Sequence, residues 1–382
     1  MKNQLFSYGI SMSKIKVLAI LGFILMASQY GQAQVNSKKY VLPEALIKKF
    51  DTHFKTPLFD KEADINRLLE AHNIPSVALG LINNGALQQI RVFGNNHSGV
   101  PVSYNSIYKV ASLTKPVTAL VALKLVNANK WDLDEPIFHF YIDDDIKDSA
   151  ELEKLTTRHI LSHQTGFPNW RYLNESQKLS FEFEPGTQYQ YSGEGFEYLR
   201  KALEHKFNKP LEDLAKELIF DPLGMNDTNF YWSENVDAAR YAVEHDEKGN
   251  PIEFEKYTKA NAAANLLTTV RDYGIFMSHI LNGAGLSKSL YSEMISKQVS
   301  VKTGVDFGLG LQIINELGNG EYALQHTGGD YGTKTIAVLF PKSKRGIIIF
   351  SNSENGMVIW KKIMEEYFGD IANELIRKNL NN

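Results

Sequence analysis

The sequence contains no cysteine among its 382 residues. This absence excludes disulfide bonds, a thiol nucleophile, thiolate metal sites and a lipidated cysteine at a processing site. The sequence also lacks a large excess of either positive or negative charge. It has 41 Lys and Arg residues and 44 Asp and Glu residues, which give a formal charge of -3. Without the basic stripe that phosphate contacts require, we expect no nucleic-acid partner.

A membrane-spanning hydrophobic run is not evident near the N-terminus. The apolar run Val17 to Ala27 has about eleven residues, short of the roughly 20 that a spanning helix needs. Lys14 and Lys16 precede it, and Gly31-Gln32-Ala33 offers small residues at the spacing that a signal peptidase accepts. We therefore predict a signal peptide over residues 1–33, cleavage after Ala33, and export to the periplasm or the medium without stable membrane insertion. Met12 is an alternative start.

The chain has enough apolar material for a large core, with 43% hydrophobic and 11% aromatic residues. Strand-like runs lie towards both ends. Ser76 to Ile82 and Ala86 to Phe93 are joined by Asn83-Asn84-Gly85, whose residues tolerate the positive φ angles of a hairpin turn. Near the C-terminus, three further runs separated by turn residues predict an antiparallel meander: Glu321 to His326, Lys334 to Phe340 and Gly346 to Ser351.

Between these ends the sequence favours helices. Pro116 to Val126 is apolar on all sides, so a helix there would be buried. From Thr157 to about Leu281, helical patterns alternate with loops, and no convincing pair of strands precedes Phe307. A last helix is predicted from apolar residues at helical spacing over Trp360 to Ile376 and should cover a sheet.

These segments predict an α/β protein of the α+β type. Its antiparallel sheet is built from N- and C-terminal segments, is flanked by helices and carries an inserted, mostly helical lobe. We expect residues 34–382 to form a single domain. About 40–115 and 300–382 would make the α/β lobe, and about 116–299 the helical lobe.

A nucleophile is suggested by the pattern Ser-x-x-Lys, which occurs four times. Two matches lie in the predicted signal peptide. A third, Ser106 with Lys109, lies in a predicted strand, where residues three apart face opposite sides. Ser112 and Lys115 instead lie at the start of the buried helix, where residues three apart share a face.

Two interpretations of Ser112 and Lys115 remain open on spacing alone. A serine hydroxyl is a poor nucleophile until a base takes its proton, and a lysine does this only when burial or a neighbouring cation lowers its pKa. The start of a buried helix offers that setting, together with unpaired backbone N–H groups for a developing oxyanion. The other interpretation is a helix N-cap serine beside a solvated lysine.

Two further segments carry residues of catalytic type. Tyr191 follows a Pro-Gly turn just before a helical stretch and would shuttle a proton if cations held it partly ionised. The run from His326 to Gly329 ends a strand, and paired glycines there let another backbone approach closely. An acyl substrate would lie along that edge, with the N–H groups of Ser112 and Gly329 as oxyanion donors.

On these residues, the chain resembles the serine β-lactamase and penicillin-binding-protein superfamily, in its class C-like branch of esterases, D-amino-acid peptidases and lactamases. The resemblance runs from about Asp64 to Phe368. It includes, in this order, "TTRHILSHQTGFP", "FEPGTQYQYSGEGFEYL", "LIFDPLGMNDT" and "HTGG…LFPKSKRGIIIFSN". It implies a β-lactamase/transpeptidase-like fold, an acyl-enzyme on Ser112 with Lys115 as its proton partner, and no metal or cofactor.

The family's Lys-Thr-Gly motif is matched by a variant that its esterases and peptidases also show. The resemblance implies that His326, Thr327 and Gly328 position the substrate and that Gly329 donates to the oxyanion. His326 replaces a fixed positive charge with one that titrates near neutrality, so binding of a substrate carboxylate should weaken as pH rises.

The family's Tyr-x-Asn motif is matched at Tyr191 only. Gly193 stands at the position of the Asn and removes a carboxamide whose hydrogen bonds are worth roughly 1 kcal/mol or more each. Strong lactamase activity is therefore not expected, and esters or neutral amides are favoured as substrates.

We therefore expect an exported serine hydrolase that cleaves an ester, amide or D-amino-acid peptide bond in a small-molecule or short-peptide substrate. A β-lactamase or D,D-carboxypeptidase is the alternative within the family. A ligand-binding or sensor protein without turnover, on the same fold, is the alternative of another class.

Two patterns suggest metal sites that we do not expect. His159 and His163 have the spacing of two zinc ligands on a helix, but Ile160 stands where the Glu of a His-Glu-x-x-His site would be, and no third ligand is evident. The run Asp143-Asp144-Asp145 is interpreted as an acidic surface loop.

Overall fold

The computed structural model describes residues 62–95, 99–253 and 255–380. These residues belong to Val41–Asn382, one of the two units into which the chain divides. The predicted signal peptide and its cleavage after Ala33 lie outside the described residues. Within the described ranges, no helix has both the length and the apolar character needed to cross a bilayer.

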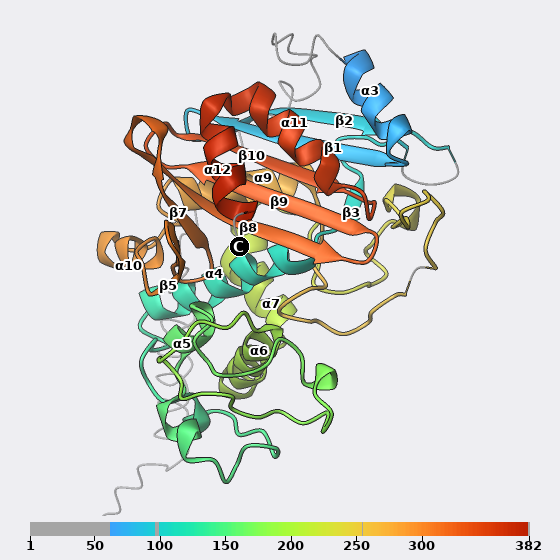
Figure 1. Ribbon diagram of the computed structural model, residues 1–382. Helices are drawn as coiled ribbons and strands as arrows, with labels where there is room; N and C mark the ends of the chain where they lie inside the picture. Colours follow the sequence, from blue (N-terminus) through green and yellow to red (C-terminus); the bar gives the residue numbers. More distant parts are fainter. Residues whose placement is uncertain (1–61, 96–98, 254, 381–382) are drawn as a thin grey trace, which may run out of the picture. The chain divides into compact units, whose positions relative to one another are not determined.

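One eight-stranded antiparallel sheet, in the order β2-β1-β10-β9-β8-β7-β6-β5, dominates the described residues (Figure 1). β1 (Ser76–Asn83) pairs with β10 (Arg345–Ser351), so segments from both ends of the chain meet in one sheet. The predicted fold class is confirmed. The other strands are β2 (Ala86–Gly94), β5 (Val299–Lys302), β6 (Val305–Phe307), β7 (Gln312–Leu317), β8 (Glu321–Asp330) and β9 (Thr333–Phe340).

The hairpin prediction is confirmed, since Asn84 and Gly85 between β1 and β2 have φ angles of 51° and 77°. The prediction that no paired strands precede Phe307 is wrong. β5 and β6 are four and three residues long, too short to show an alternating pattern. A second, two-stranded sheet pairs β3 (Ile107–Lys109) with β4 (Leu267–Thr269). The strand around Lys109 was predicted, whereas β4 was missed because it has only three residues.

The two faces of the sheet contact different hydrophobic cores, because alternate residues of a strand point to opposite sides. On β10, Ile347 and Ile349 face the core that α3 (Glu62–Ala71), α11 (Met357–Phe368) and α12 (Asp370–Leu380) cover (Figure 1). Ile348 and Phe350 face the other core, which includes α9 (Val270–Leu281) and the helical part of the chain.

The predicted single C-terminal helix is wrong in one respect, because the structure has two helices, α11 and α12, over that range. Gly369 separates them with a φ of 62°, a positive value that favours glycine. Both helices still cover the sheet (Figure 1).

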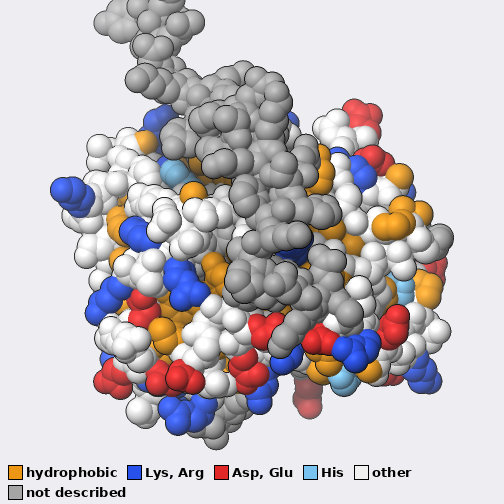
Figure 2. Space-filling view, turned by 90° about the horizontal axis from the view of Figure 1, so that it is seen from above, with side chains coloured by type: hydrophobic (Ala, Val, Ile, Leu, Met, Phe, Trp, Pro, Cys, Tyr) orange, Lys and Arg blue, Asp and Glu red, His pale blue; other side chains and the backbone are white. Residues whose placement is uncertain are grey.

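The surface shown in Figure 2 carries charged side chains of both signs. Lys and Arg side chains lie interspersed with Asp and Glu side chains across the visible described residues. Positive and negative side chains are thus mixed on this face, as their nearly equal numbers in the sequence would allow.

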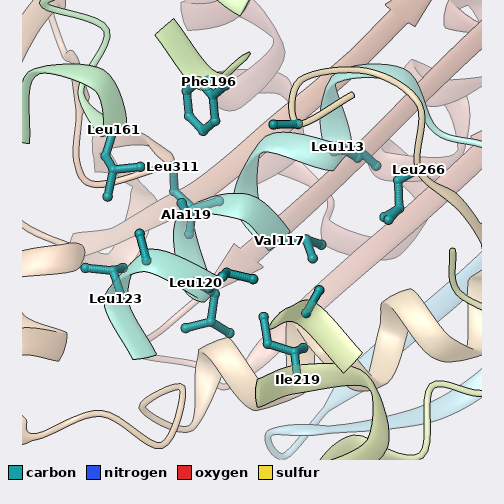
Figure 3. Packing of buried hydrophobic residues seen from close by; sticks show 14 of the residues in the cluster. Leu113, Val117, Ala119, Leu120, Leu123, Leu161, Phe196, Ile219, Leu266 and Leu311 are labelled. Atoms are coloured by element: carbon teal, nitrogen blue, oxygen red, sulfur yellow. The ribbon is translucent and has the colours of Figure 1, made fainter. Parts of the chain in front are cut away.

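The central helix α4 (Thr114–Asn127) is buried on all sides over most of its length. Figure 3 shows Val117, Leu120 and Leu123 of this helix among Leu161, Phe196, Ile219, Leu266 and Leu311 from surrounding segments. The prediction of a buried helix over Pro116 to Val126 is confirmed. Around it lie α5 (Thr157–Leu161), α6 (Gly193–Phe207), α7 (Leu211–Ala215), α8 (Asp221–Leu223) and α10 (Lys288–Met294), joined by loops.

Candidate active site

Ser112 lies in a short 3₁₀ turn, Ala111–Leu113, directly before α4. The N-cap residue of α4 is Leu113, so the N-cap interpretation of Ser112 is wrong. Ala111 has a φ of 47°, a left-handed conformation that costs a residue with a Cβ of order 1–3 kcal/mol. Such strain persists only where the surroundings hold the backbone in place, and it is common at active sites.

Three side-chain hydroxyls hold this turn by donating hydrogen bonds to its backbone carbonyls. Thr114 comes from α4, Thr335 from β9 of the large sheet and Tyr273 from α9. The turn is therefore attached to two helices and to the sheet. The bonds join Thr114 Oγ1 to Ala111 O (2.7 Å), Thr335 Oγ1 to Val110 O (2.9 Å) and the Tyr273 hydroxyl to Leu113 O (2.9 Å).

Lys115 is positioned directly against the Ser112 hydroxyl. Its Nζ donates hydrogen bonds to Ser112 Oγ at 3.1 Å and to Ala263 O at 3.0 Å. The side chain is 1% exposed. Burial lowers the pKa of the Lys115 amine to about 7, although the Glu197 carboxylate opposes this shift. A substantial neutral fraction near pH 7 makes this amine able to accept a proton.

Tyr191 contacts both members of this pair. Its pKa is raised chiefly by burial, a shift that its hydrogen bond with Ser112 partly opposes. Lys115 Nζ lies 4.6 Å from the centroid of the Tyr191 ring. The expectation that cations hold Tyr191 partly ionised is wrong: the phenol is protonated near neutral pH, and the lysine is the better base of the two.

His163 was not recognised from the sequence as part of this site. Its ring centroid lies 4.2 Å from that of Tyr191, with 30° between the ring planes. Its Nδ1 accepts a hydrogen bond from the Ser192 N–H at 3.1 Å. The ring is fully buried, and burial first, then the neighbouring Lys115, lowers its pKa well below the ordinary value. His163 is therefore a neutral ring packed behind the tyrosine.

The two histidines at zinc-ligand spacing do not share a helix, because α5 ends at Leu161 and His163 has a φ of 57°. In the part of the chain that the structure describes, no group of three potential ligands lies close enough to hold a metal ion.

His326 differs from the prediction. It is 5% exposed, and burial first, then the neighbouring Lys115, lowers its pKa to about 3. Its Nδ1 lies 2.8 Å from Thr327 O, and its ring centroid lies 6.2 Å from that of Tyr191. The expectation of a cation that titrates near neutrality is wrong, because this imidazole is buried away from water and lies near Lys115.

The strand β8 passes close to the turn that carries Ser112. A Cβ on Gly328 would collide with Val110 O and Thr335 Oγ1 and would lie 3.3 Å from Ser112 N. Only glycine permits this approach. The next residue, Gly329, has open space around its Cβ position and lines the cavity in front of Ser112 together with Thr327.

The cavity in front of Ser112 has a volume of about 570 Å³. Its wall combines carboxamides, aromatic rings and a single carboxylate. The lining residues are Ser112, Lys115, Asn169, Trp170, Tyr172, Tyr191, Tyr257, Asn261, Ala264, Asn265, Thr327, Gly329 and Asp330.

The space beside Gly193 is occupied by Trp170. A Cβ on Gly193 would lie 2.6 Å from Cζ2 of that indole, and the Gly193 N–H donates to Asn169 Oδ1 at 3.0 Å. Asn169, Asn261 and Asn265, from other segments, bring carboxamides to the wall of the same cavity. These residues were not predicted, because nothing in their local patterns indicates that they meet.

An ion-pair network anchors the loop that carries Asn169 and Trp170. Arg171 pairs with Asp143 at 3.0 Å, with Glu194 at 3.0 Å and with Asp145 at 3.1 Å. Asp143 is 5% exposed. The interpretation of the Asp143–Asp145 run as a surface loop is confirmed for Asp144 and Asp145, which are exposed, but not for Asp143, whose buried carboxylate pairs with Arg171.

Comparisons with known proteins agree on one family. The family model described as Beta-lactamase matches residues 62–362. Penicillin-binding protein 4* of Bacillus subtilis (strain 168) is 25% identical over 291 residues, which cover 66% of this chain and 62% of that protein. Esterase EstB of Burkholderia gladioli is 26% identical over 187 residues, which cover 41% of this chain and 46% of that protein. The matches span less than two thirds of the length of either relative.

A solved structure shows the same fold. D-amino acid amidase from Ochrobactrum anthropi SV3, complexed with L-phenylalanine, superposes with a TM-score of 0.69. The match has 23% sequence identity and covers 85% of this chain and 100% of that one. The antiparallel sheet with its helices is therefore a β-lactamase/transpeptidase-like fold.

Proposed function

Because the chain belongs to the beta-lactamase family and is a serine hydrolase of that family, we propose that Ser112 is its nucleophile and that it cleaves ester or amide bonds through an acyl-enzyme. The observation that carries the proposal is the contact between Ser112 Oγ and Lys115 Nζ, 3.1 Å long. The lysine is buried, and its pKa of about 7 provides the neutral amine that serine activation requires.

Acylation follows from this geometry. As Ser112 Oγ forms a bond to the carbonyl carbon, its proton passes to Lys115. The carbonyl oxygen gains negative charge, which the N–H groups of Ser112 and Gly329 stabilise by hydrogen bonds. Collapse of the tetrahedral intermediate breaks the bond to the leaving group, and Tyr191, protonated and in contact with Ser112, relays the proton to the departing oxygen or nitrogen.

Deacylation reverses the roles. A water molecule attacks the ester carbonyl of the acyl-enzyme and gives its proton to Lys115. The same two N–H groups stabilise the second oxyanion. The bond between Ser112 Oγ and the acyl carbon breaks, and the serine recovers its proton, so the cycle needs only this chain's residues and water.

Substrates without a carboxylate near the scissile carbonyl are the ones that the pocket supports best. His326 is buried and uncharged near neutral pH, so it offers no charge to a substrate carboxylate. A β-lactam or a D-Ala-D-Ala peptide carries such a carboxylate. The names of the relatives support the same choice, since an esterase and a D-amino acid amidase are among them. We infer an ester, an amide or a D-amino-acid peptide bond without a nearby carboxylate.

The experiment joins covalent labelling with turnover on the purified chain. Intact mass after exposure to a fluorophosphonate should show one adduct, absent in Ser112→Ala. A panel of p-nitrophenyl esters, D-amino-acid amides, D-Ala-D-Ala peptides and nitrocefin should show hydrolysis of the first two classes. No adduct would overturn the nucleophile assignment. A stable adduct without any hydrolysis would instead support a ligand sensor on this fold.

We also propose that the hydrolase is exported to the periplasm or the medium. The support is the pattern of residues 1–33, with lysines, a short apolar run and a small-residue cleavage site. Expression of the full chain should yield a protein whose N-terminal sequence starts at Gln34. Recovery of the intact N-terminus from the exported fraction, or retention of the whole protein inside the cell, would contradict the proposal.

A further inference from the structure

The cavity in front of Ser112 has one carboxylate in its wall. Among the described residues that line it, Lys115 is the only lysine or arginine, and Asp330 is the only aspartate or glutamate. Lys115 is buried against the nucleophile, whereas the Asp330 side chain is 46% exposed. The charge that an entering substrate meets at the wall is therefore the negative charge of Asp330.

Asp330 is held in place without being covered. Its Oδ2 accepts a hydrogen bond from Lys109 Nζ at 2.6 Å, and its Oδ1 accepts one from the Tyr331 N–H at 2.9 Å. A carboxylate has about four lone-pair sites, so each oxygen can take a further donor. The Lys109 side chain is 13% exposed and is not among the residues that line the cavity.

Besides the ring of Tyr191, three aromatic rings of the described residues line the cavity. The rings of Trp170 and Tyr172 are stacked, with centroids 6.0 Å apart and 13° between the planes. Tyr257 contributes a third ring to the lining, and Lys109 Nζ lies 5.7 Å from its centroid. Ring faces attract ammonium groups through their quadrupole, most strongly where water is partly excluded.

The field of Asp330 reaches two of these rings. The pKa of Tyr172 is raised by burial first and by the charge of Asp330 second. Burial raises the pKa of Tyr257 to about 12, with Glu255 and Asp330 contributing. A carboxylate and several aromatic faces therefore surround one space at the wall of the cavity.

We propose that Asp330, Trp170, Tyr172 and Tyr257 form a subsite for a protonated amine of the substrate, an inference that rests on the proposed function of Ser112. Asp330 directly follows Gly329, whose N–H is assigned to the oxyanion. Neighbouring Cα atoms are about 3.8 Å apart, so groups attached close to the scissile carbonyl come within reach of the carboxylate. The substrate class is an amide or ester of an amino acid or short peptide with a free amino group near that carbonyl.

Binding to a protein that cannot turn over tests the subsite directly. On the Ser112→Ala background, calorimetry compares phenylalaninamide, as each enantiomer, with 3-phenylpropionamide, which lacks only the amine. At about pH 7 the α-amino group, with a pKa of about 7.7 to 8.0, is mostly protonated. We expect the better enantiomer to bind about tenfold more tightly than the amine-free amide.

Two variants on that background separate the subsite from a general charge effect. Asp330→Asn should remove the preference for the amine, whereas Asp148→Asn, at an exposed position outside the cavity, should keep it. Lys109→Gln should increase the preference, since it removes the cation that competes for Asp330. Equal affinity for the two amides, or a preference unchanged by Asp330→Asn, would overturn the proposal. Thermal unfolding of each variant shows whether it is folded.

Fluorophosphonate labelling of the protein without substitutions distinguishes a failure of the proposed amine subsite from a failure of Ser112 as the nucleophile. A fluorophosphonate adduct on Ser112 together with no amine preference would overturn the subsite and leave the nucleophile. An amine preference without any adduct would support the subsite and overturn the nucleophile. In hydrolysis, phenylalanine p-nitroanilide should be cleaved about tenfold more efficiently than 3-phenylpropionyl p-nitroanilide, and Asp330→Asn should equalise the two.

Discussion

The imidazole of His163 packs against the phenol ring of Tyr191, with 4.2 Å between the ring centroids and 30° between the ring planes. The imidazole is buried and neutral, and its Nδ1 accepts the Ser192 N–H at the start of α6. The helix that follows Tyr191 and the ring of Tyr191 itself are thus held by one side chain. We assign His163 as a positioning residue for the tyrosine.

His163→Phe keeps a ring against Tyr191 but leaves the Ser192 N–H without its acceptor. An unsatisfied buried donor costs about 1–3 kcal/mol, so the free energy of unfolding should fall by that amount. His163→Ala removes the ring as well and should lower kcat about 10²-fold by misplacing Tyr191. Chemical denaturation and steady-state kinetics measure the two effects. Equal kcat values for the Phe and Ala variants would contradict a positioning role for the ring.

Tyr191→Phe tests the relay of the proton. Burial keeps the phenol protonated near neutral pH, so the role we propose for it is to pass a proton to the leaving group rather than to act as the resting base. We expect kcat to fall about 10²- to 10⁴-fold, with the thermal unfolding temperature nearly unchanged. Fluorophosphonate labelling of Ser112 should slow much less than ester hydrolysis. A loss of less than about tenfold would assign proton transfer to Lys115 alone.

The pKa of Lys115 sets the pH dependence of the reaction. Burial lowers this pKa to about 7, and only the neutral amine accepts the serine proton. The value of kcat/KM for a neutral ester should therefore rise with pH and level off above about 7. Below a pH of about 7 the protonated amine of Lys115 predominates, and activity is lost. A rate that is flat between pH 5 and 8 would contradict Lys115 as the base.

His326 should not contribute to that pH profile. Its pKa of about 3 leaves it neutral throughout the range in which Lys115 titrates. His326→Gln should therefore keep the midpoint of the pH profile for a neutral ester, even if the rate at the plateau falls. A midpoint that moves by more than about one pH unit would show that the imidazole titrates with the reaction.

Gly193 and Trp170 should be energetically coupled. Gly193→Asn alone introduces a Cβ 2.6 Å from the indole, and overpacking of this kind costs about 1–3 kcal/mol. The double variant Gly193→Asn with Trp170→Ala should recover most of that stability, because the smaller residue vacates the space. A double-mutant cycle by denaturant unfolding measures the coupling. Additive effects would show that the indole moves away without cost.

Local signals in the sequence determined several features. Asn84 and Gly85 determined the hairpin, because their tolerance of positive φ angles is a local property. The apolar stretch of α4 determined its own burial. Strand-like runs bounded by turn residues revealed β1, β2, β8, β9 and β10, whereas β5 and β6 were too short to form such a run. The break at Gly369 was missed because apolar spacing continues across it.

The sequence predicted the contact at the centre of the site but not the environment of its residues. Ser112 and Lys115 lie on one turn of chain, so their contact follows from local helical spacing. The environment of each group depends on segments far apart in the sequence, and burial and nearby charges set its pKa. Only the tertiary structure therefore decided that His326 is neutral, that Tyr191 is protonated, that His163 supports it, and that Trp170 and Asp330 share one cavity with Ser112.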